Sequence, residues 1–194
     1  MHKQISILVG SLRTKSYARQ IAMLTQSMFP SDYDVRILEI GDLPLYNFDY
    51  DDPQLPEVAV PEVYTEFRTA IKNSSAVLFV TSENNRLLPA CLKNAVDIGS
   101  KPNDDVAWKG KVAGIISHSV GRMGGYSAQK SLRLALSYFD MVFPNQPEVF
   151  LGQSSSLLDE AGSFNSPATH KFVQAYIARI VDLIESVSAS ENLG

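Results

Sequence analysis

The feature that most constrains the fold is a series of short apolar runs, each followed by a segment with helical periodicity. The first run, residues 5–9, combines β-branched and aliphatic residues in the manner of a strand buried on both faces of a parallel sheet. Similar runs follow at 34–40, 76–80, 111–117 and 141–149, and Pro144 and Pro147 interrupt the last one. Amphipathic helices are predicted after each strand, ending with one marked by Val173, Ile177, Ile180 and Ile184.

This alternation of strands and helices predicts one α/β domain over residues 1–194. Crossovers between parallel strands are right-handed, so the helices cover both faces of the sheet. We therefore expect a flavodoxin-like three-layer α/β/α sandwich, with a five-stranded parallel sheet in the order 2-1-3-4-5.

Composition narrows the class of protein. The chain is 45% hydrophobic and 20% charged, as is usual for a globular domain, and its net charge of −4 argues against nucleic acid or an anionic membrane as the main partner. A single cysteine, Cys91, excludes an intramolecular disulfide framework. Residues 1–4 lead directly into the first strand and no run is long enough for a membrane span, so we expect a cytoplasmic protein.

The segment after the first strand has the residues of an anion-binding loop. Gly10 ends the strand, Ser11 and Ser16 supply hydroxyl groups, and Arg13 supplies positive charge. Ser16 is the expected N-cap of the next helix, whose free amide groups would then face the loop. The spacing lacks the second glycine of a Walker A motif and the paired glycines of a dinucleotide fingerprint, so a terminal monophosphate is the preferred guest. An ordinary strand-to-helix turn with solvated cations is the alternative.

Two further loops are expected at the same edge of the sheet, after the third and fourth strands. The first is polar and runs from Ser82 through Glu83 and Asn84 to Asn85. The second runs from Ser119 to Gly125, and its glycines, Gly121, Gly124 and Gly125, would let the backbone approach a flat ligand. The connection over 41–61 is rich in proline, and its carboxylates Asp49, Asp51 and Asp52 are interpreted as a solvated face, because they lack the pattern of a calcium loop.

Over residues 4–139 the chain resembles the NADPH-dependent FMN reductase family, which includes quinone, azo-dye and chromate reductases. The resemblance rests on Gly10-Ser11-Leu12-Arg13 with Ser16, on Leu43-Pro44-Leu45-Tyr46-Asn47 with Asp49, on Leu92-Lys93-Asn94-Ala95-Val96-Asp97, and on Gly124-Gly125 with Leu132-Arg133.

The resemblance implies an FMN cofactor, NADPH or NADH as electron donor, a small-molecule electron acceptor, and assembly as a homodimer or homotetramer. It places Ser11, Arg13, Ser16 and Tyr17 around the FMN phosphate. It also implies that two groups of residues flank the ribityl chain and the isoalloxazine: Ser82, Glu83, Asn84 and Asn85, and Ser119, Gly121, Gly124 and Gly125. No catalytic acid or base is implied, because the flavin carries the redox chemistry.

Three positions depart from the family pattern: Ser82 replaces a proline, Asn84 a tyrosine and Ala18 an asparagine. Loss of one hydrogen bond to a phosphate predicts FMN affinity lower by roughly tenfold or more. These departures keep open a non-enzymatic protein that binds a partner or another anion. A serine hydrolase using Ser119 and His170 is the remaining alternative, although Ser117 stands where a nucleophile elbow needs glycine.

Overall fold

The structure, a computed structural model, describes residues 3–191 and confirms the predicted sheet. Five parallel strands lie in the order β2-β1-β3-β4-β5. They are β1 (Lys3–Gly10), β2 (Tyr33–Leu38), β3 (Ala76–Thr81), β4 (Val112–His118) and β5 (Val149–Leu151). The strands β1, β3 and β4 form the centre of the sheet, with Ile5 beside Ala76 and Val77 beside Ala113.

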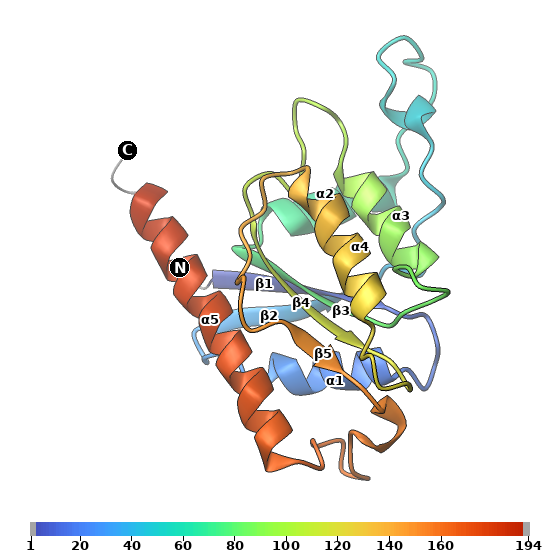
Figure 1. Ribbon diagram of the computed structural model, residues 1–194. Coiled ribbons are helices and arrows are strands. Elements are labelled where there is room, and N and C mark those ends of the chain that lie inside the picture. The colour runs from blue at the N-terminus through green and yellow to red at the C-terminus, as the bar shows by residue number, and fades with distance from the viewer. Residues whose placement is uncertain (1–2, 192–194) are drawn as a thin grey trace.

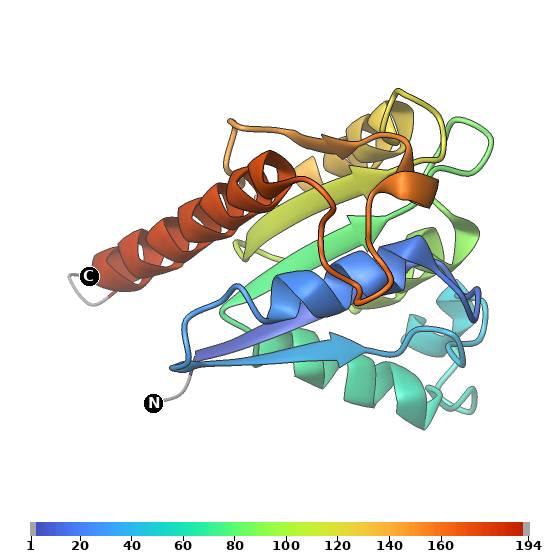
Figure 2. The ribbon, with the colours of Figure 1, turned by 90° about the horizontal axis from the view of Figure 1, so that it is seen from below.

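Helices cover both faces of the sheet and give the three layers seen in Figures 1 and 2. One face carries α1 (Tyr17–Gln26) and α5 (Pro167–Glu191), which pack on alternate strand residues such as Ile5, Ile7 and Val9. The other face carries α2 (Glu62–Lys72), α3 (Ala90–Gly99) and α4 (Tyr126–Ser137), which pack on Leu8 and Phe79. Two short 3-10 helices, Phe48–Asp51 and Ser154–Ser156, lie in the connections. Each face thus has its own apolar core, as the alternation of strand side chains requires.

The last strand differs from the prediction. A fifth strand is present, as predicted, but the range 141–149 is wrong, because β5 begins only at Val149 and pairs with Ile116–His118 of β4. Within the earlier part of that range, Val142 forms only an isolated bridge to Val112. Pro144 and Pro147 lie between them, and proline cannot donate a ladder hydrogen bond. The apolar run is therefore split into a bridge and a short edge strand.

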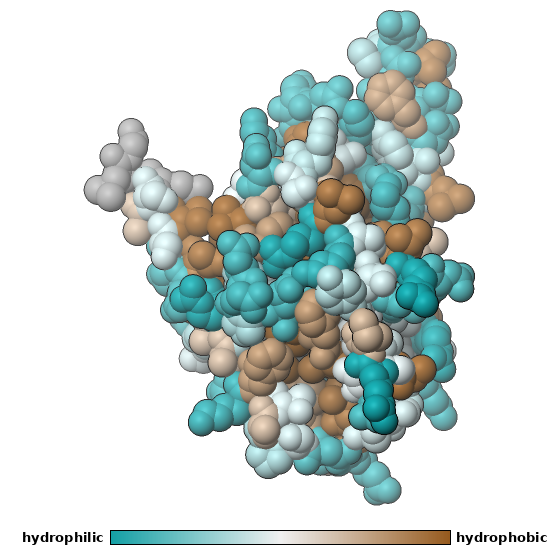
Figure 3. Space-filling model, viewed as in Figure 1, coloured by the Kyte–Doolittle hydropathy of each residue, from teal (hydrophilic) through white to brown (hydrophobic). Residues whose placement is uncertain are grey.

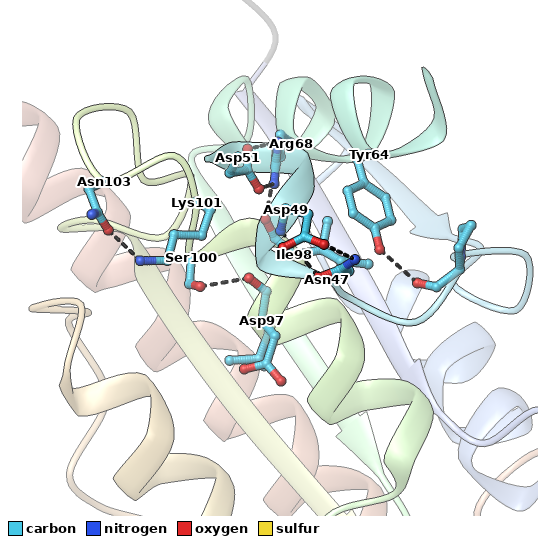
Figure 4. Close-up of polar contacts among 12 residues, drawn as sticks. Asn47, Asp49, Asp51, Tyr64, Arg68, Asp97, Ile98, Ser100, Lys101 and Asn103 are labelled. Atoms are coloured by element: carbon cyan, nitrogen blue, oxygen red, sulfur yellow. Dashed lines mark hydrogen bonds and ion pairs between the residues drawn. The ribbon is translucent and has the colours of Figure 1, made fainter. Parts of the chain in front are cut away.

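The connection over residues 41–61, which we call the arm, projects from the body at the upper right of Figure 1. The prediction that its carboxylates form a solvated face is wrong for Asp51, whose side chain is 4% exposed and ion-paired with Arg68 of α2. Arg68 donates to both Asp51 carboxylate oxygens, at 3.0 and 2.6 Å, and to the carbonyl of Ile98 at the end of α3 (Figure 4). The arm is therefore fixed to two helices through one buried guanidinium.

A second anchor holds the base of the arm. The Asn94 side chain in α3 accepts a hydrogen bond from the Tyr46 amide at 2.8 Å and donates to the carbonyls of Leu43 and Pro44. Tyr64 also donates to the Pro44 carbonyl, at 3.0 Å. Asn94 of the segment at 92–97 thus holds the segment at 43–47, and both segments belong to the sequence resemblance described above.

In residues 3–191, no helix is both long enough and apolar enough to cross a membrane.

Candidate functional site

A cleft of about 610 Å³ opens at the carboxyl ends of β1, β3 and β4, where the three predicted loops meet. This position follows from the fold, because loops after neighbouring parallel strands gather at one edge of the sheet. Its volume is within the range of small-molecule sites. The cleft is lined by Ser11, Leu12, Arg13, Ser16, Tyr17, Ser82, Glu83, Asn84, Pro89, Ala90, Cys91, His118, Ser119 and Val120.

The first loop presents a helix N-terminus to the cleft. Ser16 is the N-cap of α1, as predicted, and its Oγ accepts a hydrogen bond from the Arg19 amide at 3.2 Å. The amide groups of Tyr17 and Ala18 precede Arg19 in the first turn, where a helix offers no internal acceptor. That turn contains no acidic residue. Together with the exposed Arg13 and the hydroxyl of Ser11, this end of the cleft has the donors and the positive potential that an anion requires.

The second loop is tied to both of its neighbours. The Ser82 hydroxyl donates to the Gly10 carbonyl at 3.0 Å, and a Glu83 carboxylate oxygen accepts from the Ala128 amide in the first turn of α4 at 3.1 Å. Asn84 exchanges two backbone hydrogen bonds with Leu87, which closes a tight turn with Asn85 at φ 50°. Three of the four predicted residues therefore line the cleft, whereas Asn85 lies outside its lining.

The third loop contributes less to the cleft than predicted. Ser119 lines it, but Gly121, Gly124 and Gly125 do not. A Cβ atom at Gly124 would lie 2.6 Å from the Phe150 carbonyl carbon, and one at Gly125 would lie 2.8 Å from the His118 carbonyl oxygen. Both glycines also have positive φ, at 61° and 77°. Close packing against β4 and β5 of the same chain therefore requires glycine at both positions, and the approach of a flat ligand stays a prediction.

Sequence reasoning did not place His118, the last residue of β4, in the cleft. The side chain lines the cleft and packs edge-on against the Tyr17 ring, with centroids 6.3 Å apart. It is only 6% exposed, neither ring nitrogen has a hydrogen-bond partner among the described residues, and burial lowers its pKa to about 4. Its position directly before Ser119, at the end of a central strand, was the signal that could have identified it.

Cys91 also lines the cleft, from the first turn of α3. Its placement on that helix agrees with the prediction, and it is half-buried. Burial raises the pKa of the thiol, so the neutral form dominates near pH 7. Cys91 is therefore a small apolar part of the wall and not an activated nucleophile.

The arrangement does not form a hydrolase triad. The Ser119 hydroxyl donates to the Gly121 carbonyl at 3.1 Å, and His170 packs against Phe164 near the start of α5. Among residues 3–191, no group of three or more histidine, cysteine or acidic side chains is placed to hold a metal ion. The N-terminus of α1, with Arg13 beside it in the lining of the cleft, instead fits a ligand with a terminal monophosphate, such as FMN.

Comparison with known proteins shows the family to which the chain belongs. The model of the NADPH-dependent FMN reductase family matches residues 4–156. The chain is 41% identical over 181 residues to a quinone reductase of Pseudomonas putida, covering 93% of this chain and 94% of that protein. It is 39% identical over 177 residues to a 2-hydroxy-1,4-benzoquinone reductase of a Burkholderia species, covering 91% and 93% of the two chains.

Among solved structures, the flavoenzyme FerB, an NAD(P)H:(acceptor) oxidoreductase from Paracoccus denitrificans, superposes with a TM-score of 0.85. It is 33% identical, and the match covers 95% of this chain and 98% of that one. The family model, the relatives and the fold agree. The chain belongs to the NADPH-dependent FMN reductase family.

Proposed function

We propose that this protein is an FMN-dependent NAD(P)H oxidoreductase that passes electrons to a small acceptor such as a quinone, a free flavin or an azo compound. The observation that carries the proposal is the meeting of the three loops around one cleft, with a helix N-terminus and Arg13 at its end. The family membership and the named activities of the relatives support it.

In this proposal the first loop binds the FMN phosphate. The hydroxyl groups of Ser11 and Ser16 and the first-turn amides of α1 donate hydrogen bonds, and Arg13 supplies charge. Ser16 already accepts from the Arg19 amide, so its O–H remains able to donate to a ligand. Ala18 is fully buried in the core. It therefore adds no side-chain contact to the phosphate, and we expect FMN to be held less tightly than in relatives with asparagine there.

The other two loops hold the walls of the cleft in position. Glu83 joins the second loop to α4, and Ser82 joins it to the end of β1. When bound, FMN supplies hydride acceptance from a nicotinamide and electron transfer to the acceptor. The protein therefore needs to bind, orient and partly desolvate the reactants, and no side chain of the cleft has to act as acid or base.

The rim of the cleft suits flat apolar acceptors. Leu12 is 61% exposed and Val120 is 67% exposed, and they line the cleft from the first and third loops respectively. An aromatic acceptor or a nicotinamide ring resting between them would cover apolar side chains that otherwise face water. Neither of these two side chains has a charge or a hydrogen-bonding group that would select one acceptor, which supports a broad acceptor range.

We also propose that the protein is a homodimer or homotetramer that uses the arm, α3 and α4. On α4, Leu134 is 75% exposed and the adjoining Tyr138 is 86% exposed, and Leu45 of the arm is 82% exposed. Figure 3 shows a further hydrophobic patch over β5, between α4 and α5. Such apolar groups favour contact with a second copy.

We further propose a cytoplasmic location. It fits a chain with one cysteine, which is a half-buried free thiol.

The test is a titration of flavin-stripped protein with FMN, followed by quenching of flavin fluorescence, in wild type and Arg13→Ala. Loss of a charge-assisted contact at an exposed side chain should weaken FMN binding about tenfold or more. Arg179→Ala is the matched control, because Arg179 is an exposed arginine of α5 that pairs with Asp182. It should bind FMN as wild type does.

The same preparations are then assayed for oxidation of NADH and NADPH with a quinone. Saturable FMN binding that Arg13→Ala weakens, together with FMN-dependent oxidation, supports the proposal. Wild-type protein that neither binds FMN nor oxidises either nucleotide with FMN supplied would refute it and favour the non-enzymatic alternative.

A further inference from the structure

His118 is a buried polar side chain that the fold leaves without a hydrogen-bond partner. It closes β4 at the cleft, and both Nδ1 and Nε2 are enclosed and unpaired among the described residues. Buried polar atoms are nearly always hydrogen-bonded in proteins, so an unpaired ring at a binding cleft calls for an explanation. The location at the cleft favours one explanation, namely a bound ligand that supplies the missing hydrogen-bond partner.

Polar side chains of the neighbouring strand, loops and helix have hydrogen bonds of their own. On its own strand and loop, the Ser117 hydroxyl donates to the Gly124 carbonyl and the Ser119 hydroxyl donates to the Gly121 carbonyl. In α4, Gln129 donates to Ser117 and to the Val149 carbonyl. Across the cleft, Glu83 accepts from the Ala128 amide, and α1 presents the edge of the Tyr17 ring. His118 itself lines the cleft, so a ligand bound there lies within reach of the ring.

The chemistry of the ring indicates what kind of partner it would take. With its pKa lowered by burial, the imidazole is neutral near pH 7 and offers one N–H donor and one nitrogen acceptor. A phosphate prefers cationic donors, which the first loop provides. A hydroxyl group both donates and accepts, so it matches a neutral imidazole. The contact with Tyr17 places His118 beside the first turn of α1, next to the proposed phosphate site.

We propose that His118 is a binding residue for the polyol chain of the flavin, to which its ring hydrogen-bonds after turning toward the cleft. This inference rests on the proposed function and names the part of the ligand that one residue recognises. The turn is required because both nitrogens are enclosed in the structure, and it is a rotation about side-chain torsions, of which the second has a broad minimum in histidine.

The test compares His118→Phe, which keeps the ring shape without polar atoms, with His118→Gln, which keeps a donor and an acceptor. Flavin-stripped proteins are titrated with FMN and with riboflavin, which lacks the phosphate. We expect His118→Phe to lower the affinity for both ligands by a similar factor of about ten, and His118→Gln to retain most of the affinity for FMN. Arg13→Ala, by contrast, should lower the affinity for FMN alone. His170→Phe, at the histidine that packs on Phe164, should change neither affinity.

A second readout is the thermal stability of the flavin-free proteins. His118→Phe removes two unpaired buried nitrogens, so its Tm without flavin should equal or exceed that of wild type, and the rise in Tm on adding FMN should be smaller. Unchanged FMN affinity in His118→Phe would overturn the proposal, as would a loss confined to FMN or an equal loss in His118→Gln. Failure of wild type to bind FMN at all would instead refute the proposed function.

Discussion

The buried ion pair between Asp51 of the arm and Arg68 of α2 allows a quantitative prediction. Asp51→Ala removes both hydrogen bonds to Arg68 and leaves its guanidinium, 7% exposed, with the Ile98 carbonyl and the face of the Tyr64 ring. Removing one partner of a buried pair costs about 3–5 kcal/mol, because the remaining charge is buried without compensation. The arm is a surface connection that can lift and admit water to Arg68, so we expect the lower end, about 3 kcal/mol.

Urea unfolding measures this cost directly. A loss of about 3 kcal/mol in a chain of this size corresponds to a fall in Tm of about 6–12 °C. Limited proteolysis should also become faster around residue 51, because this part of the arm loses its tie to Arg68, whereas Asn94 and Tyr64 still hold the segment at 43–46. Asp49→Ala is the matched control, since Asp49 is an exposed carboxylate on the same arm that accepts a hydrogen bond from the Asn47 side chain. It should change the free energy of unfolding by less than about 0.5 kcal/mol.

A double-mutant cycle separates the ion pair from the loss of packing. Arg68→Met alone should destabilise, and Asp51→Ala combined with Arg68→Met should cost about 2 kcal/mol less than the sum of the single changes. If Asp51→Ala and Asp49→Ala have equal effects on stability and on proteolysis, Asp51 does not hold the arm and the reasoning from its burial is wrong.

Further predictions concern the α1 cap, a tight glycine and the pH dependence of stability. Ser16→Ala should cost about 1 kcal/mol in urea unfolding, because the Arg19 amide loses its acceptor; no change would mean that water replaces the cap. Gly99→Ala should cost about 1–3 kcal/mol, because its Cβ would lie 2.5 Å from the rigid Trp108 ring, whereas Gly121→Ala, with its nearest contact at 3.9 Å, should be nearly neutral. Burial lowers the pKa of His118 from its ordinary value of 6.5 to about 4, so between these two pH values the imidazole takes up its proton only in the unfolded chain. Stability should therefore fall by about 2 kcal/mol from about pH 7 to pH 5, and His118→Phe should lack this part of the fall in a series of urea titrations.

The strands of the central sheet were predictable because their residues point to two cores. Each of β1, β3 and β4 is a nearly continuous apolar run, and the predicted limits fall within two residues of those observed. The short edge strand β5 was not predictable in the same way. It has only three residues and is set by pairing with β4, which is a long-range interaction with no local pattern.

The cleft shows the same contrast between local and long-range information. Ser16 could be identified as a cap because the residues it serves lie within the next turn of the chain. The burial of Asp51 depends on Arg68, and the position of Glu83 depends on Ala128. Nothing in the residues adjoining Asp51 or Glu83 in sequence marks these partners. Likewise, the crowding around Gly124 becomes apparent only once β5 lies beside the loop.

The residues of the cleft come mostly from loops and first helical turns, while β1, β3 and β4 contribute mainly buried side chains to the two cores. Substitutions in the loops and first helical turns can therefore change ligand preference, whereas stability depends mainly on the separate set of core positions. Ser82 illustrates this separation, because it stands where the family pattern described above has proline. Its hydroxyl donates a hydrogen bond to the Gly10 carbonyl, and the preceding strand β3 is intact. Enzymes of different acceptor range can in this way diverge from one ancestral scaffold through exchanges in the loops alone.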